Sequence, residues 1–197
     1  MHIFSGIHKN RVLESPKRDI TRPTSGRLRE TLFNICQQYV AECRFLDLFA
    51  GSGAMGLEAL SRGAIKSTFV DSSKESIRCI KTNVNTLKEE GHTKIIYGDV
   101  FEQLIKLAKE GCQYDIIYAD PPYENIIHTP QEALFLSARL LKIIDEQLEN
   151  QIQLLVPGGM FFIEEAANVS LENIPLLHLK LKNSRSTGKA ALHYYTY

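Results

Sequence analysis

The sequence has no tryptophan and no net charge, and its few cysteines form no recognisable cluster. The four cysteines are Cys36, Cys43, Cys79 and Cys112. No two of them have only two residues between them, the spacing that is common among zinc ligands. The six histidines are scattered and add no such pair, so the pattern argues against a metal centre. We interpret the cysteines as free thiols, mostly buried, in a protein of a reducing compartment.

Long apolar runs are also missing. No stretch approaches the ~20 apolar residues that a membrane-spanning helix needs, and the opening Met-His-Ile-Phe-Ser-Gly is not the apolar centre of a signal peptide. A content of 44% hydrophobic and 23% charged residues over 197 residues is ordinary for one globular domain. We expect a cytoplasmic protein without a membrane partner, and a monomer as the simplest oligomeric state.

The zero net charge conceals a segregation of charge along the chain. Residues 1–35 carry seven Lys or Arg against three acids, and residues 176–197 carry four Lys or Arg and no acid. Two ends of net charge +4 therefore flank a middle of net charge −8. Basic ends of this kind suit nucleic-acid phosphates, although any single lysine is as readily a solvated surface residue.

Strand-like and helix-like segments alternate through the body of the chain, which predicts an α/β fold with a doubly wound, mostly parallel sheet. The expected strands are 45–49, 67–70, 94–97, 116–119 and 160–164, and the expected helices between them are 56–61, 74–88, 101–109 and 131–147.

The two ends of the chain depart from this alternation. Residues 177–182 and 190–197 are expected to close the sheet as an antiparallel pair, and a helix capped by Ser25 is expected from residue 26 to about residue 39. Residues 1–20 are predicted to form a basic β-hairpin extension, which leaves 21–197 as the main domain.

A glycine-rich turn follows the first predicted strand, where Phe45-Leu-Asp-Leu-Phe-Ala runs into Gly51-Ser-Gly-Ala-Met-Gly. Gly51 permits the tight turn, Gly53 lets the backbone approach a ligand, and Gly56 allows the helix to pack closely on the strand. Asp71 then ends the second predicted strand, at the spacing expected for an acid that binds ribose hydroxyls. The pattern predicts a site for a nucleotide-like cofactor.

Two further acids change the expected cofactor from a nicotinamide dinucleotide to S-adenosylmethionine. Asp47 lies inside the strand before the glycines, where a carboxylate suits the positively charged methionine end and poorly suits a pyrophosphate. Asp120-Pro-Pro-Tyr123 follows the fourth predicted strand, and its prolines fix the backbone into a rigid platform with one acceptor and one aromatic ring.

These segments together resemble the bacterial methyltransferases that modify the exocyclic N2 of one guanine in 16S ribosomal RNA. The resemblance covers most of the chain, and Arg-Pro-Thr at 22–24 followed by Arg-Glu-Thr-Leu-Phe-Asn at 29–34 is its most specific part. Where the family usually has a glycine in the N-terminal hairpin, this chain has Asn10, a residue that tolerates positive φ.

The resemblance implies a seven-stranded, Rossmann-like fold, S-adenosylmethionine as cofactor, and 16S rRNA in the small ribosomal subunit or an assembly intermediate as partner. We expect the Asp120 carboxylate and the Pro121 carbonyl to accept hydrogen bonds from the amino group, and Tyr123 to stack on the unstacked base. The expected cofactor-binding residues are Asp47, Phe49, Gly51, Gly53, Asp71, Asp99, Thr24 and Arg27, where Asp99 serves equally well as a helix cap. The expected RNA-binding residues are Lys9, Arg11, Arg22, Arg185 and Lys189.

Other functions remain open on the sequence. An adenine-N6 DNA methyltransferase would use the same Asp-Pro-Pro-Tyr chemistry, but little of the chain remains for a target-recognition region. Enzymes that methylate a protein glutamine favour Asn at position 120. A non-catalytic ribosome-assembly factor and a dehydrogenase complete the alternatives, and cofactor binding would separate both from the methyltransferase.

Overall fold

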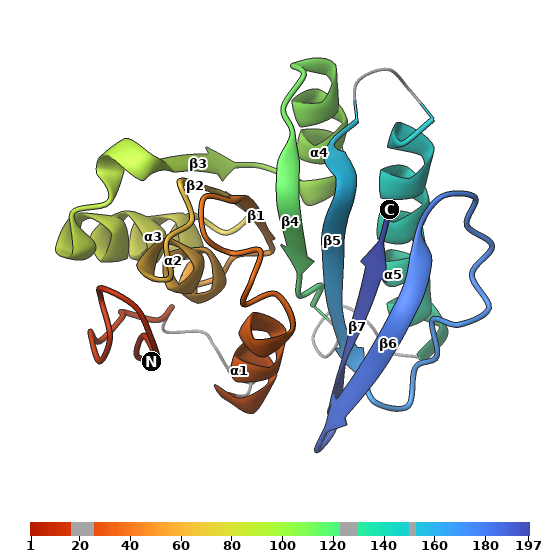
Figure 1. The fold of residues 1–197 in the computed structure, drawn as a ribbon, viewed down its shortest axis with the longest axis horizontal. Helices are drawn as coiled ribbons and strands as arrows, with labels where there is room; N and C mark the ends of the chain where they lie inside the picture. The colour runs from red at the N-terminus through yellow and green to blue at the C-terminus, as the bar shows by residue number, and fades with distance from the viewer. Residues whose placement is uncertain (17–25, 123–129, 150–152) are drawn as a thin grey trace.

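The computed structural model describes residues 1–16, 26–122, 130–149 and 153–197, and for residues 130–135 it describes the backbone alone. Within these ranges the chain forms a seven-stranded sheet of order β3-β2-β1-β4-β5-β7-β6 (Figure 1). The strands are β1 (Arg44–Leu48), β2 (Lys66–Asp71), β3 (Thr93–Tyr97), β4 (Tyr114–Ala119), β5 (Leu155–Ala166), β6 (Lys180–Thr187) and β7 (Ala190–Thr196). The strands β1 to β5 pair in parallel, and β7 pairs antiparallel with both β5 and β6, which confirms the mostly parallel sheet.

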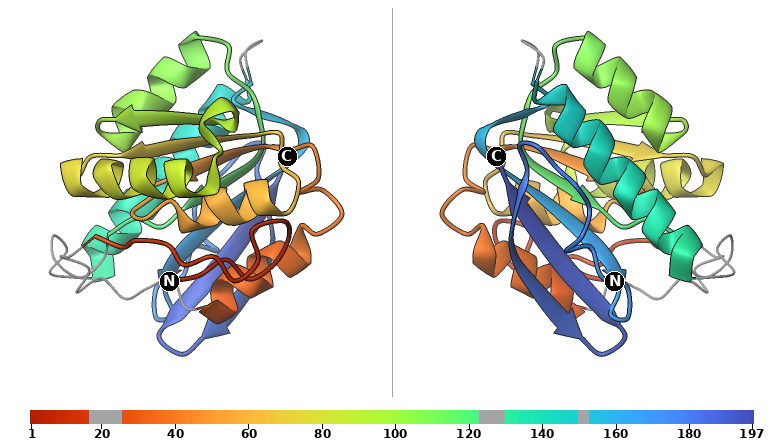
Figure 2. Two further views of the ribbon diagram at one scale, coloured as in Figure 1. Left: turned by 90° about the vertical axis from the view of Figure 1, so that its left-hand side faces the viewer. Right: turned by 90° about the vertical axis from the view of Figure 1, so that its right-hand side faces the viewer.

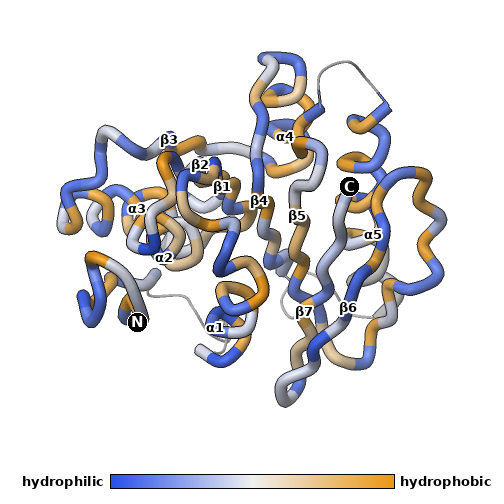
Figure 3. The backbone as a smooth tube through the Cα atoms, viewed as in Figure 1, coloured by the Kyte–Doolittle hydropathy of each residue, from blue (hydrophilic) through white to orange (hydrophobic). Residues whose placement is uncertain are grey.

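Helices cover both faces of the sheet and produce three layers (Figure 2). The helices are α1 (Gly26–Ile35), α2 (Ala54–Ser61), α3 (Lys74–Leu87), α4 (Val100–Lys109) and α5 (Pro130–Gln147), with a 3-10 turn η1 at Glu90–His92. One core cluster joins α1, α2 and α3 to the sheet, and a second joins α4 and α5 to its other face. Apolar stretches follow the central strands in Figure 3, and no helix in the described ranges is long and apolar enough to span a membrane.

Three cysteines, Cys36, Cys43 and Cys79, are buried as free thiols, and Cys112 is half-buried. Burial raises the pKa of both Cys36 and Cys43 to about 12, so these two thiols stay protonated at neutral pH. Within the described residues no group of three or more His, Cys, Asp or Glu side chains is arranged to hold a metal ion.

The last strands and the first helix differ from the expected boundaries. β6 begins at Lys180 rather than at residue 177, because the amides of Leu177, His178 and Leu179 donate to the buried carboxylate of Asp145 at 2.7, 2.9 and 2.7 Å. Those donors are consequently not used in a strand ladder. Helix α1 ends at Ile35 rather than near residue 39, and the chain then turns back toward β1.

The N-terminal segment, residues 1–16, is tied to helix α2 by a buried carboxylate. Glu58 is completely buried, and its oxygens accept from the amides of Phe4 and Ser5 at 2.8 and 3.0 Å. Ile3 and Leu13 are buried in the core cluster beside α2. The two arms of the expected hairpin pair antiparallel at a bridge between His2 and Val12, where the amide of Ile3 donates to the carbonyl of Arg11 at 3.0 Å and the amide of Leu13 to the carbonyl of Met1 at 2.8 Å. The proposed division at residue 20 falls outside the described residues and stays a prediction.

Helix α1 holds the same segment from its other side. Arg29 is 3% exposed, donates from Nη2 to the carbonyl of His2 at 2.8 Å, and lies 4.1 Å over the ring of Phe4. Burial lowers the pKa of Arg29, and the negative charge of Glu58 opposes this effect. Asn10 adopts φ 67°, the left-handed conformation expected where the family usually has glycine.

Gly56 lets helix α2 lie directly on strand β2. A Cβ at this position would overlap the hydroxyl of Ser67 and the ring of Phe69, both of which point from β2 toward the helix. The third glycine of the motif is therefore required by helix–sheet packing, as the sequence predicts.

We expect Gly56→Ala to lower the free energy of unfolding by about 2 kcal/mol, because the added methyl group has no space between α2 and β2. Urea denaturation followed by circular dichroism measures the change. Gly91→Ala is the matched control, since a Cβ at Gly91 meets nothing within 4 Å. Equal stabilities of the two variants would show that α2 does not pack as described.

Candidate active site

The carboxyl ends of β1, β2 and β4 meet at one level of the sheet. Leu48 of β1 is in register with Val70 of β2 and with Ala119 of β4, so the next residues, Phe49, Asp71 and Asp120, follow side by side. The chain leaves β1 toward β2 and β3 on one side, and later returns to place β4 and β5 on the other. The boundary between β1 and β4 is the topological switch point, where ligands bind in open α/β sheets.

Asp71 is bound to the glycine-rich turn. Its Oδ2 accepts from the amide of Gly51 at 2.8 Å, and its Oδ1 accepts from the amide of Ser73 at 2.7 Å. Gly51 and Gly53 have φ of 54° and 77°, which favours glycine at both positions. The structure thus brings together the turn and the acid that the sequence assigns to one cofactor.

Asp47 lies beneath this turn and is 1% exposed. Its Oδ2 accepts from the amide of Gly56 at 2.9 Å, and its Oδ1 has no hydrogen-bond partner among the described residues. Burial raises the pKa of the Asp47 carboxyl well above its usual range; the Gly56 hydrogen bond opposes the rise, and the negative charge of Asp71 adds to it. Asp47 is therefore a buried acid to which a cation would be strongly attracted.

Asp99 is the N-cap of helix α4. Its Oδ1 accepts from the amides of Phe101 and Glu102 at 3.0 and 3.1 Å, so the capping role that the sequence allows is present. Its side chain is exposed at the carboxyl end of β3, two residues beyond Tyr97, which is in register with Asp71. Phe49 has φ 57° and packs edge-on against Phe101, with 6.5 Å between the ring centroids. Asp99 and Phe49 thus border the same edge of the sheet as the glycine turn.

Asp120 and Pro121 extend β4 at this edge. The amide of Asp120 donates to the carbonyl of Leu48 at 3.4 Å, which continues the ladder with β1 for one residue. Asp120 is half-buried and Pro121 is buried. Tyr123 and Thr24 lie outside the described residues. Arg27 is exposed on the first turn of α1.

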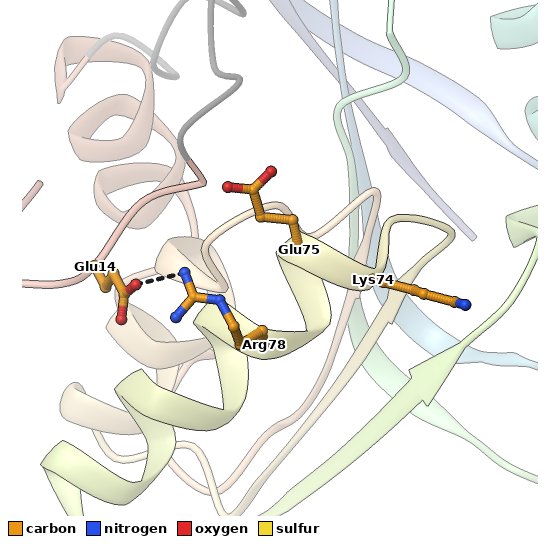
Figure 4. A pocket seen from close by; sticks show the side chains of 4 residues that line it. All are labelled: Glu14, Lys74, Glu75 and Arg78. Atoms are coloured by element: carbon orange, nitrogen blue, oxygen red, sulfur yellow. Dashed lines mark hydrogen bonds and ion pairs between the residues drawn. The ribbon is translucent and has the colours of Figure 1, made fainter.

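A hollow of about 520 Å³ lies beside the start of helix α3 and is lined by Glu14, Lys74, Glu75 and Arg78. Figure 4 shows Glu14 and Arg78 pointing toward each other, with 2.6 Å between Oε1 and Nη2, whereas Lys74 points away. Asn83 fixes this wall to the glycine turn, because its side-chain amide donates to the carbonyls of Glu14 and Ser52 at 2.9 Å each. The N-terminal segment therefore borders the cofactor side of the edge.

The candidate RNA-binding residues fall into two groups. Lys9 and Arg11 are exposed on the N-terminal segment, and Arg185 and Lys189 are exposed on the β6–β7 hairpin. Arg22 lies outside the described residues. In Figure 1 helix α1 lies between the N-terminal segment and the turn of this hairpin.

Sequence reasoning missed several buried acids, among them Glu58 and Glu164. Glu164, 2% exposed, lies near the carboxyl end of β5, and its Oε2 accepts from the hydroxyl of Tyr118 at 2.9 Å. The signal was present in Met-Phe-Phe-Ile-Glu, an apolar strand that ends in a carboxylate as β2 does at Asp71. Glu58 gave no such signal, because a glutamate in a helix is ordinarily exposed.

Two of the solved structures that match this architecture are titled putative methyltransferases. The protein yhhF of Escherichia coli superposes with a TM-score of 0.76 over 99% of this chain and 96% of its own, at 29% identity. SMU.776, solved in complex with SAH, matches 86% of this chain and 48% of its own, with a TM-score of 0.65. At 18% identity SMU.776 shows the shared fold alone.

Relatives match by sequence over a similar range. YlbH of Bacillus subtilis is 35% identical over 171 residues, which are 87% of this chain and 85% of YlbH. Ribosomal RNA small subunit methyltransferase D of Escherichia coli K12 is 32% identical over 155 residues, 76% of each chain. The family model described as Conserved hypothetical protein 95 matches residues 1–196. The chain is therefore a member of the Conserved hypothetical protein 95 family, and it is similar to the relative named Ribosomal RNA small subunit methyltransferase D.

Proposed function

We propose that this protein transfers a methyl group from S-adenosylmethionine to the exocyclic N2 of a guanine in 16S rRNA. The observation that carries the proposal is the meeting of Asp71, the glycine turn and Asp120-Pro121 at the switch point of the sheet. One half of this edge has the groups that a nucleoside cofactor needs, and the other half has acceptors for an amino group. The name of the Escherichia coli relative supports a small-subunit rRNA as the substrate class.

The residues of the glycine turn fit the cofactor. The unmatched Oδ1 of Asp47 is a buried acceptor that suits the methionine ammonium, whose charge would favour the ionised form of the carboxyl. We assign Asp71, at the end of β2, to the ribose hydroxyls, and Asp99, which follows β3 on the neighbouring strand, to the adenine amino group. We assign Phe49, Gly53, Thr24 and Arg27 to the walls of the same site.

Asp120 and Pro121 make the amino nitrogen reactive. That nitrogen is a poor nucleophile because its lone pair is delocalised into the base, and the bound cofactor supplies an activated methyl group on a sulfonium. The Asp120 carboxylate and the Pro121 carbonyl accept one N–H each, which favours a pyramidal nitrogen with its lone pair directed at the methyl. As positive charge develops on the nitrogen, the carboxylate stabilises it. Tyr123 stacks on the base.

The basic ends of the chain contribute phosphate contacts. Lys9 and Arg11 project from a segment that Glu58 and Arg29 hold in place, so this pair is presented with little loss of conformational entropy. Arg185 and Lys189 are exposed on the β6–β7 hairpin, and we assign Arg22 to the group of Lys9 and Arg11.

Incubation with radiolabelled S-adenosylmethionine tests the reaction. Small ribosomal subunits from cells that lack the homologous enzyme, naked 16S rRNA and duplex DNA are the three substrates, and the products are digested to nucleosides. We expect label as N2-methylguanosine. Label found only as N6-methyladenine in DNA would contradict rRNA as the substrate. A calorimetric titration without cofactor binding would contradict the assignment of the protein as an S-adenosylmethionine-dependent enzyme.

We expect Asp120→Ala to lower kcat about 100- to 1,000-fold while the affinity for S-adenosylmethionine changes little, because the carboxylate acts on the amino group rather than on the cofactor. Steady-state kinetics and calorimetry measure the two quantities. Asp115→Asn is the matched control on the same strand, since Asp115 pairs with Arg44 at the opposite end of β4. Turnover near the wild-type value in Asp120→Ala would contradict the mechanism.

We expect Asp71→Ala to weaken binding of S-adenosylmethionine by about tenfold or more, because it removes both the ribose acceptor and the partner of the Gly51 amide. Calorimetric titration of the variant against the wild type measures the loss. Asp115→Asn again controls for the removal of a charge. A dissociation constant equal to that of the wild type would exclude Asp71 from the cofactor site.

A further inference from the structure

Glu164 lies one strand away from Asp120. Ala119 of β4 and Ile163 of β5 are the last pair in register, and Asp120 and Glu164 are the residues that directly follow them. Neighbouring strands are about 4.8 Å apart. Two carboxylates of different strands are therefore adjacent at the ligand-binding edge of the sheet.

The two side chains are directed to the same face. Side chains alternate along a strand, so Tyr118 and Asp120 share one face of β4. Glu164 is on that face as well, because its Oε2 accepts from the hydroxyl of Tyr118 at 2.9 Å. Tyr118 is in register with Phe162, which lies two residues before Glu164. The Tyr118 hydroxyl therefore extends toward the carboxyl ends of the strands, where it meets the Glu164 carboxylate.

Glu164 is a buried acid at the edge of the sheet where ligands bind. A carboxylate that is 2% exposed costs free energy that an apolar residue in the strand would not cost. Residues that break the burial rule are concentrated at functional sites. The next residue, Glu165, is equally buried but faces α5, where its oxygens accept from the Ser137 hydroxyl at 2.6 Å and the Ala166 amide at 2.8 Å.

We propose that Glu164 selects guanine by accepting a hydrogen bond from its N1–H while Asp120 and Pro121 hold N2. This inference rests on the proposed function and names the group that distinguishes the base. In guanine the N1–H and the N2 amino group are neighbouring donors on one edge of the ring, and they match two neighbouring acceptors. An ionised carboxylate only accepts hydrogen bonds. Adenine presents an unprotonated N1 next to its amino group, so its N1 would face Glu164 without a proton between them.

2-Aminopurine separates the recognition of N1–H by Glu164 from the activation of N2 by Asp120, because it keeps the exocyclic amino group at C2 but has no proton on N1. A site built to accept a hydrogen bond from a substrate rejects an analogue that lacks the donor, by about 100-fold or more. Glu164→Gln replaces one acceptor oxygen by an amide that can donate to the unprotonated N1. The variant should therefore lose the preference for guanine while Asp120 continues to activate N2.

The experiment uses 16S rRNA with guanine or a single 2-aminopurine at the methylated position. The rRNA is supplied naked or reconstituted into subunits, whichever form the wild-type enzyme methylates. For each enzyme we measure the ratio of kcat/KM for the two RNAs and the ratio of their dissociation constants. We expect a kcat/KM ratio of about 100 or more for the wild type and below about 10 for Glu164→Gln. Glu165→Gln, a neighbouring buried acid on the other face, should keep the wild-type ratio.

Tyr118→Phe is the second variant and keeps the packing of the ring. It removes the hydroxyl that orients the carboxylate, so its ratio should fall between those of the wild type and Glu164→Gln. If Glu164→Gln fails to fold, the ratio measured for Tyr118→Phe tests the role of Glu164. If the wild type methylates guanine and the variants that fold keep its ratio, the role of Glu164 is overturned and the proposed function is left intact. A wild type that methylates no guanine would overturn both.

Discussion

The register of β1 with its two neighbours is the constraint on which the rest of the site depends. Parallel strands end at one edge of a sheet, and the pairing of Leu48 with Val70 and Ala119 brings three of these ends level. The glycine turn, Asp71 and Asp120 then meet, although they come from separate parts of the chain. A shift by one residue would turn each of these side chains to the other face. The buried core on both faces prevents such a shift.

Buried carboxylates connect segments that are distant in the sequence. Asp71 accepts from the amide of Gly51, Glu58 from amides of the N-terminal segment, and Asp145 from three amides before β6. A carboxylate is suited to this because its two oxygens accept several charge-assisted hydrogen bonds from backbone amides that helices and strands leave unused. Asp47 follows the same pattern with one oxygen, and its other oxygen has no hydrogen-bond partner among the described residues.

The adjacent acids of β5 show how the alternation of a strand places identical side chains in different surroundings. Glu165 faces helix α5 and finds its donors in the folded chain, and burial raises the pKa of its carboxyl. Glu164 faces the side of α1 and Asp120, where the substrate base is expected. Identical side chains at successive positions thus have different environments, because consecutive residues of a strand point to opposite faces.

The sequence by itself determined the order of strands and helices, the glycine turn, and the acids that end β2 and β4. Local spacing and backbone chemistry are sufficient for these features, and φ of 54° and 77° at Gly51 and Gly53 reflects this local requirement. The tertiary structure alone decided that Asp145 delays the start of β6, that Glu58 anchors the N-terminal segment, and that Glu164 lies beside Asp120. Each of these depends on contacts between residues dozens of positions apart, and no local pattern encodes which distant amides or carboxylates will meet.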